Sequence, residues 1–184
     1  MKLSQIIADD KLKYTIYCDM DGVLTDFSGD FIRHSRLNST FPLDERNDVP
    51  NNAAFRYEKK YGSDAFWDVV ASGGLKFWSE MSWNPGGKKL WSFIKKYNPE
   101  ILTAPSKKVY DDCVKGKKMW ITRLGNPPIH IRSKERKKEF AGKNKILIDD
   151  LKSNILEWTS NGGIGILHKK TNNTIAQLKE LGLN

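Results

Sequence analysis

The sequence has few cysteines and no long apolar run, and both absences limit the kind of protein it can be. Only 2 of the 184 residues are cysteines, Cys18 and Cys113, so a disulfide framework is excluded, and neither has the neighbours that a zinc site needs. No apolar stretch approaches the roughly 20 residues of a membrane-spanning helix. Near the first residue, the apolar run 6–8 is too short for a targeting signal, and two acidic residues follow it. We therefore expect a cytoplasmic protein that does not contact membranes.

Disorder is also disfavoured, although the chain is polar. Hydrophobic residues make up 39% of the sequence and charged residues 29%, but 6 Trp, 6 Tyr and 8 Phe supply large apolar side chains that disordered chains usually lack. A chain of this length can bury one sizeable core. We expect a single domain that carries an insertion.

The chain has no acidic excess, and its positive charge is unevenly distributed. Residues 1–100 carry 14 basic and 14 acidic side chains, whereas residues 101–184 carry 17 and 8, so the net charge of +9 lies entirely in the second half. An excess of this kind favours an anionic partner such as nucleic acid, a membrane surface or a phosphorylated small molecule.

Short apolar runs alternate with helix-compatible stretches through the second half, which predicts an α/β fold. Each apolar run of two to four residues is followed by a polar segment long enough for a helix, and such repeats form parallel strands joined by right-handed crossovers. The sequence therefore predicts a Rossmann-like parallel sheet. The expected strands are 14–18, 101–103, 129–131, 146–148 and 164–167.

Residues 28–85 differ in composition from the rest of the chain. They contain many aromatic side chains among polar residues, but no run that resembles a buried strand. We interpret this stretch as a helical cap inserted after the first strand, with residues 1–27 and 86–184 forming the core. The turn Asn84-Pro85-Gly86-Gly87 would return the chain to the core.

Two carboxylates follow the first predicted strand in the run Asp19-Met20-Asp21-Gly22-Val23. Residues two apart on an extended chain point the same way, so Asp19 and Asp21 converge at the carboxyl end of the strand, where open parallel sheets place their sites. Adjacent carboxylates repel and need a cation, a shared proton or a lysine. A calcium EF-hand is excluded, because positions 6 and 12 from Asp19 are Leu24 and Asp30 rather than Gly and Glu.

Polar residues also follow two other predicted strands. Asp149 and Asp150 come after the apolar strand 146–148, and together with the first pair they outline a magnesium site. Asp150 could instead cap the next helix. The strand at 101–103 ends in Thr103, followed by Ala104, and a hydroxyl with free backbone N–H groups at this point can hold a phosphoryl oxygen.

The order of these motifs resembles that of haloacid-dehalogenase-like (HAD) phosphatases. The resemblance covers about residues 14–168 and implies an aspartyl-phosphate mechanism. In that mechanism Asp19 would attack phosphorus and Asp21 would act as general acid and base. Thr103 and a lysine would bind the phosphoryl group, while Mg²⁺ would be held by Asp19, the Asp21 carbonyl and the Asp149–Asp150 pair.

The lysine is the least determined member of this set. Lys138, 11 residues before Asp149, lies where the third motif of the family falls, and Lys137 is its close competitor. Lys117 is a second candidate for phosphate binding. Any one of these lysines could equally lie on a solvated helix face.

Within the superfamily, the sequence is most similar to the 5′(3′)-deoxyribonucleotidases, through residues 21–27 and parts of the predicted cap. The resemblance implies cap aromatics that stack on the nucleobase, here Phe27, Phe55 and Trp78. Arg56 stands where a second cap aromatic is expected, and Ala104 replaces a common hydroxyl.

The resulting hypothesis is a magnesium-dependent nucleotidase that acts on nucleoside monophosphates as a monomer or homodimer. A phosphatase for polynucleotide ends or sugar phosphates is the first alternative. A non-catalytic nucleic-acid-binding protein is the second, and it is not favoured because every acidic residue of the motifs is present. The chain also resembles phage-borne relatives of the family.

Overall fold

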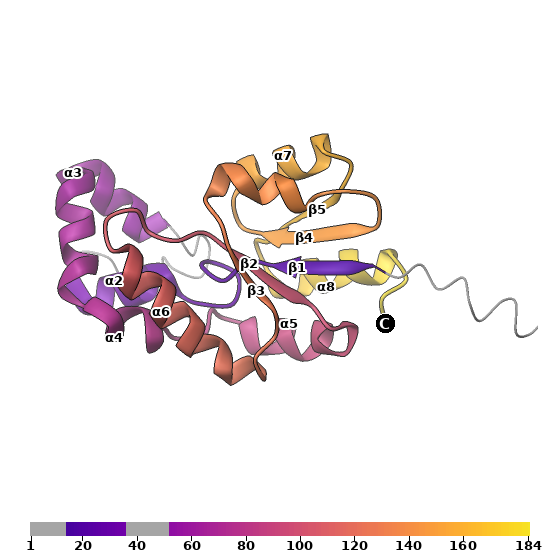
Figure 1. Cartoon of the computed structure of the whole chain (residues 1–184), viewed down its shortest axis with the longest axis horizontal. Helices are drawn as coiled ribbons and strands as arrows, with labels where there is room; N and C mark the ends of the chain where they lie inside the picture. The colour runs from indigo at the N-terminus through magenta and orange to yellow at the C-terminus, as the bar shows by residue number, and fades with distance from the viewer. Residues whose placement is uncertain (1–13, 36–51) are drawn as a thin grey trace, which may run out of the picture.

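A single parallel sheet organises the molecule, whose computed structural model describes residues 14–35 and 52–184 (Figure 1). The five strands lie in the order β3-β2-β1-β4-β5, and every neighbouring pair is parallel. The expected α/β fold class with a Rossmann-like sheet is therefore confirmed. The strands are β1 (Thr15–Cys18), β2 (Glu100–Thr103), β3 (Ile129–Ile131), β4 (Lys145–Asp149) and β5 (Ile164–Leu167).

Helices connect the strands and cover both faces of the sheet (Figure 1). In the core these are α5 (Gly87–Ile94), η2 (Lys95–Tyr97), α6 (Tyr110–Trp120), η3 (Ile121–Leu124), η4 (Lys134–Phe140), α7 (Lys152–Ser160) and α8 (Thr171–Glu180). Between β1 and α5 lie α2 (Phe27–Ser35), α3 (Asn52–Ser72) and α4 (Gly74–Ser79). None of the helices in the described ranges is both long and apolar enough to cross a membrane.

Alternating side chains of the central strand β1 divide the core into two layers. Ile16 and Cys18 are buried in the larger apolar cluster, together with Leu90 of α5 and Leu178 of α8. Tyr17 points the other way and packs edge-on against Trp158 of α7, with ring centroids 5.4 Å apart. The sheet is thus covered on both sides, which explains why its strands read as continuous apolar runs.

The cap segment, defined as residues 28–85, contains α3, α4 and all but the first residue of α2. Its described part lies off the carboxyl ends of the strands (Figure 1), and residues 36–51 of the prediction lie outside the described residues. Gly62 interrupts α3 with a φ of 89°, a left-handed conformation that glycine adopts without strain.

Helix α4 is packed directly onto α6. A Cβ added to Gly116 of α6 would lie 2.4 Å from Cβ of Trp78, so glycine is what permits this close approach. Hydrogen bonds also join the end of α4 to the end of α6. Trp120 Nε1 donates to the Met81 carbonyl at 2.7 Å, and the Arg123 guanidinium donates to the carbonyls of Met81 and Ser79. This part of the cap segment is therefore fixed to the core.

Candidate active site

A tight turn after β1 presents the first pair of acids. The backbone N–H of Asp19 donates to the Ile148 carbonyl at 2.9 Å, which places Asp19 beside the end of β4. Leu24 and Thr25 both donate their backbone N–H groups to the Met20 carbonyl at 2.8 Å. Gly22 has a φ of 77°, which favours glycine at the bend. Asp21 is thereby held at the carboxyl edge of the sheet.

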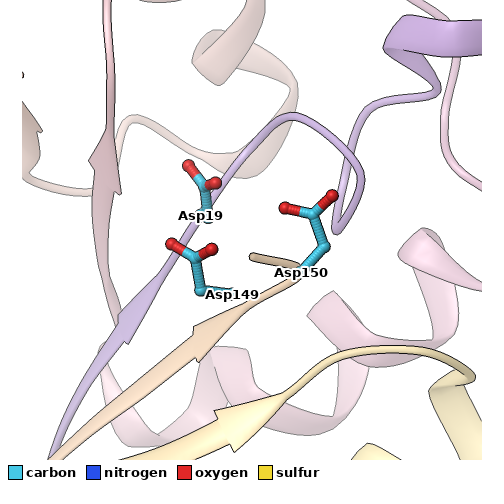
Figure 2. A group of neighbouring side chains, drawn as sticks. All are labelled: Asp19, Asp149 and Asp150. Atoms are coloured by element: carbon cyan, nitrogen blue, oxygen red, sulfur yellow. The ribbon is translucent and has the colours of Figure 1, made fainter. Parts of the chain in front are cut away.

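Three carboxylates converge at this edge (Figure 2). Asp19 follows β1, Asp149 is the last residue of β4 and Asp150 comes directly after it, and one oxygen of each lies within 4.8 Å of the others. Asp19 and Asp149 are buried, and the Asp150 carboxyl group points toward them from the far side (Figure 2). Such a group of oxygen ligands suits a hard divalent cation.

Burial and the neighbouring charges raise the pKa values of two of these acids. Burial, followed by repulsion from Asp19, raises the pKa of Asp149 above its ordinary value, although Lys137 opposes the rise. Burial and the charges of Asp19 and Asp149 raise the pKa of Asp150 well above its usual range. The negative form of both carboxyl groups is therefore disfavoured at this place unless a cation is present.

Lys137 is the lysine that reaches the acid cluster. Its side chain is buried, and Nζ lies 2.7 Å from Asp149 Oδ2 and 3.1 Å from Asp19 Oδ1. Burial would lower the pKa of Lys137, but the attraction of Asp19 and Asp149 outweighs it and raises that pKa. The ammonium is therefore held charged between the two carboxylates.

The structure places Lys138, the other predicted lysine, beside Glu157. Its ammonium lies 3.8 Å from Glu157 Oε2, and both side chains are more than two-fifths exposed. Lys137 and Lys138 belong to η4, a 3-10 helix in which consecutive side chains point about 120° apart. The ammonium of Lys137 therefore lies in the site, while that of the next residue, Lys138, lies at the surface. The spacing of the motifs is not precise enough to distinguish between two adjacent lysines.

Lys117 occupies a second buried position. No part of its side chain is exposed, and Nζ donates to Asp21 Oδ2 at 2.7 Å, to Thr103 Oγ1 at 2.7 Å and to the Ala104 carbonyl at 2.8 Å. Burial would lower the pKa of Lys117, but attraction to Asp21 prevails and raises it. All three ammonium protons are engaged, so Lys117 joins the ends of β1 and β2.

The end of β2 supplies a hydroxyl and a carbonyl. Thr103 is fully buried, and its carbonyl accepts the backbone N–H of Arg132 at 3.0 Å. Its Oγ1 accepts from Lys117, which leaves the hydroxyl proton available for donation. Further along this loop, the Ser106 backbone N–H donates to Cys113 Sγ at 3.3 Å.

Several polar residues that sequence reasoning missed orient the acids. Asn154, in the first turn of α7, donates Nδ2 to both oxygens of Asp149, at 3.0 and 2.9 Å. Thr25 Oγ1 donates to Asp21 Oδ1 at 3.0 Å, and Asn84 Nδ2 donates to the Gly22 carbonyl at 2.8 Å. Thr25 lay within the first motif, so its position was a usable signal, whereas only the fold brings Asn84 to this loop.

The start of α7 lies directly after Asp150. The N-cap residue of α7 is Leu151, whose own side chain makes no capping hydrogen bond. The backbone N–H of Leu151 donates to Asp149 Oδ1 at 2.9 Å. The Asp150 carboxyl group itself belongs to the acid cluster.

The structure brings two of the three candidate aromatic residues toward the acids. Phe27 lies 5.7 Å from Trp78 between ring centroids, and Lys117 Nζ lies 5.5 Å from the Trp78 ring. Trp78 is only 2% exposed. Phe55 is 70% exposed and has no ring contact with other described residues. The structure therefore leaves Phe55 on the surface, away from Phe27 and Trp78.

Comparison with solved structures identifies the fold. The chain is similar to a hydrolase of Streptococcus pneumoniae, with 12% identity, a TM-score of 0.54 and coverage of 91% of this chain and 99% of that one. It is also similar to a HAD-superfamily hydrolase, subfamily IA, of Geobacter sulfurreducens (11% identity, TM-score 0.51, coverage 93% and 99%). A haloacid dehalogenase-like family hydrolase of Streptococcus pneumoniae gives 15% identity, a TM-score of 0.50 and 90% coverage of both chains.

These similarities lie in the fold rather than in the sequence. No family model matches the chain, and no curated protein matches its sequence. The fold is nevertheless similar to those of the two solved HAD hydrolases over at least 90% of each chain.

Proposed function

We propose that this protein is a HAD-superfamily phosphomonoesterase that depends on magnesium and hydrolyses nucleoside monophosphates. The observation that carries the proposal is the group of Asp19, Asp149 and Asp150, of which the first two are buried, with the Lys137 ammonium between those two. The group lies at the carboxyl edge of a parallel sheet, where ligands of such folds bind.

The charges at the edge fit a divalent cation. Lys117 pairs with Asp21, and Lys137 supplies one positive charge to three further carboxylates. Two negative charges remain if all three acids are ionised. Burial first, and then repulsion among the acids, raises the pKa values of Asp149 and Asp150. Asp19, Asp149 and Asp150, with the Asp21 carbonyl, would hold Mg²⁺, which would stabilise negative charge on the phosphoryl oxygens.

Asp19 is suited to attack phosphorus. Its Oδ1 accepts the backbone N–H of Met20 at 2.8 Å and faces Lys137, whereas Oδ2 accepts no hydrogen bond from a described residue. We assign Oδ2 as the nucleophile. A bond forms between Oδ2 and phosphorus as the bond from phosphorus to the substrate alcohol oxygen breaks. The third ammonium proton of Lys137 is available for a phosphoryl oxygen.

Asp21 transfers the protons. In its protonated form it donates to the departing alkoxide and becomes a carboxylate. It then accepts a proton from water, whose oxygen attacks phosphorus and releases phosphate and the Asp19 carboxylate. Lys117 and Thr25 each bond one carboxylate oxygen of Asp21, so they are positioning residues that set its direction.

A nucleoside is the proposed leaving group because an aromatic side chain lies near the lysine that bonds Asp21. The Trp78 ring of the cap segment lies 5.5 Å from Lys117 Nζ, and Phe27, at the border of that segment, lies 5.7 Å from Trp78 between ring centroids. The similarity of residues 21–27 to the first motif of deoxyribonucleotidases supports the same substrate class. Phe55 is not included, because it faces solvent.

The test is phosphate release from a panel of nucleoside 5′- and 3′-monophosphates, sugar phosphates and phosphorylated oligonucleotides, with Mg²⁺ and with EDTA. We expect turnover of mononucleotides that EDTA abolishes and that Asp19→Asn eliminates. Activity that persists in Asp19→Asn would contradict the mechanism. Turnover of sugar phosphates or oligonucleotides alone would contradict the substrate class.

A further inference from the structure

A buried donor beside the candidate active site lacks an acceptor. Trp78 is 2% exposed, and no acceptor among the described residues bonds its indole Nε1–H. A buried N–H group without a partner is unfavourable, and such groups are rare in folded proteins. The unpaired Trp78 Nε1–H therefore calls for a physical reason.

The other fully buried tryptophans do not share this feature. Trp120 Nε1 donates to the Met81 carbonyl at 2.7 Å, and Trp158 Nε1 donates to the Lys145 carbonyl at 3.1 Å. Both of these residues lie in the core. The fold can therefore satisfy a buried indole, and the exception is the tryptophan that lies next to the site.

The surroundings of Trp78 connect it to the leaving-group side of the proposed reaction. Its ring lies 5.5 Å from Lys117 Nζ, and the same ammonium bonds Asp21, the proposed acid for the departing alcohol. The Trp78 backbone cannot retreat, because Gly116 of α6 lies directly under its Cβ. The indole is therefore held near the region where the alcohol would lie.

We propose that the Trp78 Nε1–H recognises an oxygen acceptor on the leaving nucleoside, such as a sugar hydroxyl or a base carbonyl. This inference rests on the proposed nucleotidase function and adds a hydrogen bond to it. Trp78 then acts as a hydrogen-bond donor, which differs from the stacking role that the family resemblance implies. Its ring lies 5.7 Å from that of Phe27 and 5.2 Å from that of Phe77 between centroids.

Substrate entry must uncover the donor. Nε1 is shielded from solvent, so a neighbouring side chain has to move before an acceptor can reach it. Phe27 is a partly buried neighbour of Trp78, and the two ring centroids lie 5.7 Å apart. We assign the required movement to Phe27, because α4 is fixed on α6.

The kinetic test compares Trp78→Phe with Trp158→Phe. Trp78→Phe keeps an aromatic ring and removes an unsatisfied donor, so KM for a nucleoside monophosphate should rise about 3- to 10-fold, while kcat and Tm do not fall. Trp158→Phe leaves the Lys145 carbonyl without its donor, so Tm should fall and KM should stay unchanged. An unchanged KM in an active Trp78→Phe enzyme would overturn the inference but not the nucleotidase function.

A second measurement observes the donor directly. In a ¹⁵N-labelled protein, the indole peak that disappears in Trp78→Phe belongs to Trp78, and it should shift downfield when a nucleoside is added. Inorganic phosphate alone should not shift it. A shift with phosphate alone, or none with nucleoside, would overturn the assignment of the acceptor. Wild-type protein that releases phosphate from no nucleotide would refute the proposed function and, with it, this inference.

Discussion

Lys137 donates to Asp149, 12 residues further along the chain, at 2.7 Å, whereas the adjacent Lys138 lies 3.8 Å from Glu157. The buried ammonium lies between two carboxylates that would otherwise repel each other. This relationship separates two adjacent lysines that look alike in the sequence.

We predict that Lys137→Gln lowers kcat/KM by about 10²- to 10³-fold, since a preorganised charge beside the phosphoryl group contributes on that order. Lys138→Gln is the matched control and should remain within a few-fold of wild type. Steady-state kinetics on the best mononucleotide measure both. The reverse ranking would show that Lys138 supplies the charge.

Metal binding should stabilise the folded protein measurably. A cation that neutralises the acid cluster at 100 times its Kd contributes about 2.7 kcal/mol, which for a chain of this size raises Tm by about 5–10 °C. Differential scanning calorimetry with and without Mg²⁺ measures this shift. Asp150→Asn should reduce it sharply, and a full shift in that variant would place the metal elsewhere.

His168 should make stability depend on acid pH. Burial lowers the pKa of His168 to about 4, from a usual value near 6.5. Between pH 4 and 6.5 the unfolded state therefore binds more protons than the folded state. The contribution of the neutral His168 to the free energy of unfolding is complete above pH 6.5 and is lost as the pH falls to 4. It amounts to at most about 3 kcal/mol.

Urea denaturation at pH 4.5, 5.5 and 7 tests the effect of His168. The stability of His168→Gln should change less between these pH values than that of wild type. His34→Gln is the control, because His34 is exposed. Parallel pH profiles for wild type and His168→Gln would show that other groups dominate.

Gly116 should tolerate no side chain. A Cβ there would lie 2.4 Å from Trp78 Cβ and 3.0 Å from the Ser79 backbone nitrogen, so Gly116→Ala must separate α4 from α6. Overpacking of this kind costs about 1–3 kcal/mol. Thermal unfolding should show a lowered Tm, whereas Lys118→Ala, on the exposed side of α6, should leave it nearly unchanged.

The sequence by itself determined the sheet and most of the acids. Each strand was readable because a parallel strand covered on both faces is a continuous apolar run, and Asp19, Asp149 and Thr103 are the residues at which three such runs end. The carboxyl ends of parallel strands meet at one edge, so their convergence followed from the order of elements alone.

Only the tertiary structure decided which side chains complete the site. Lys137 rather than Lys138 reaches Asp19 because the direction of a side chain in η4 changes with every residue. Lys117 meets Asp21, 96 residues away, because α6 packs beside the end of β1. Trp78 is buried without an acceptor among the described residues for its indole N–H, whereas Phe55 is exposed to solvent. The burial of each side chain depends on contacts between segments far apart in the chain, and a local sequence pattern does not encode such contacts.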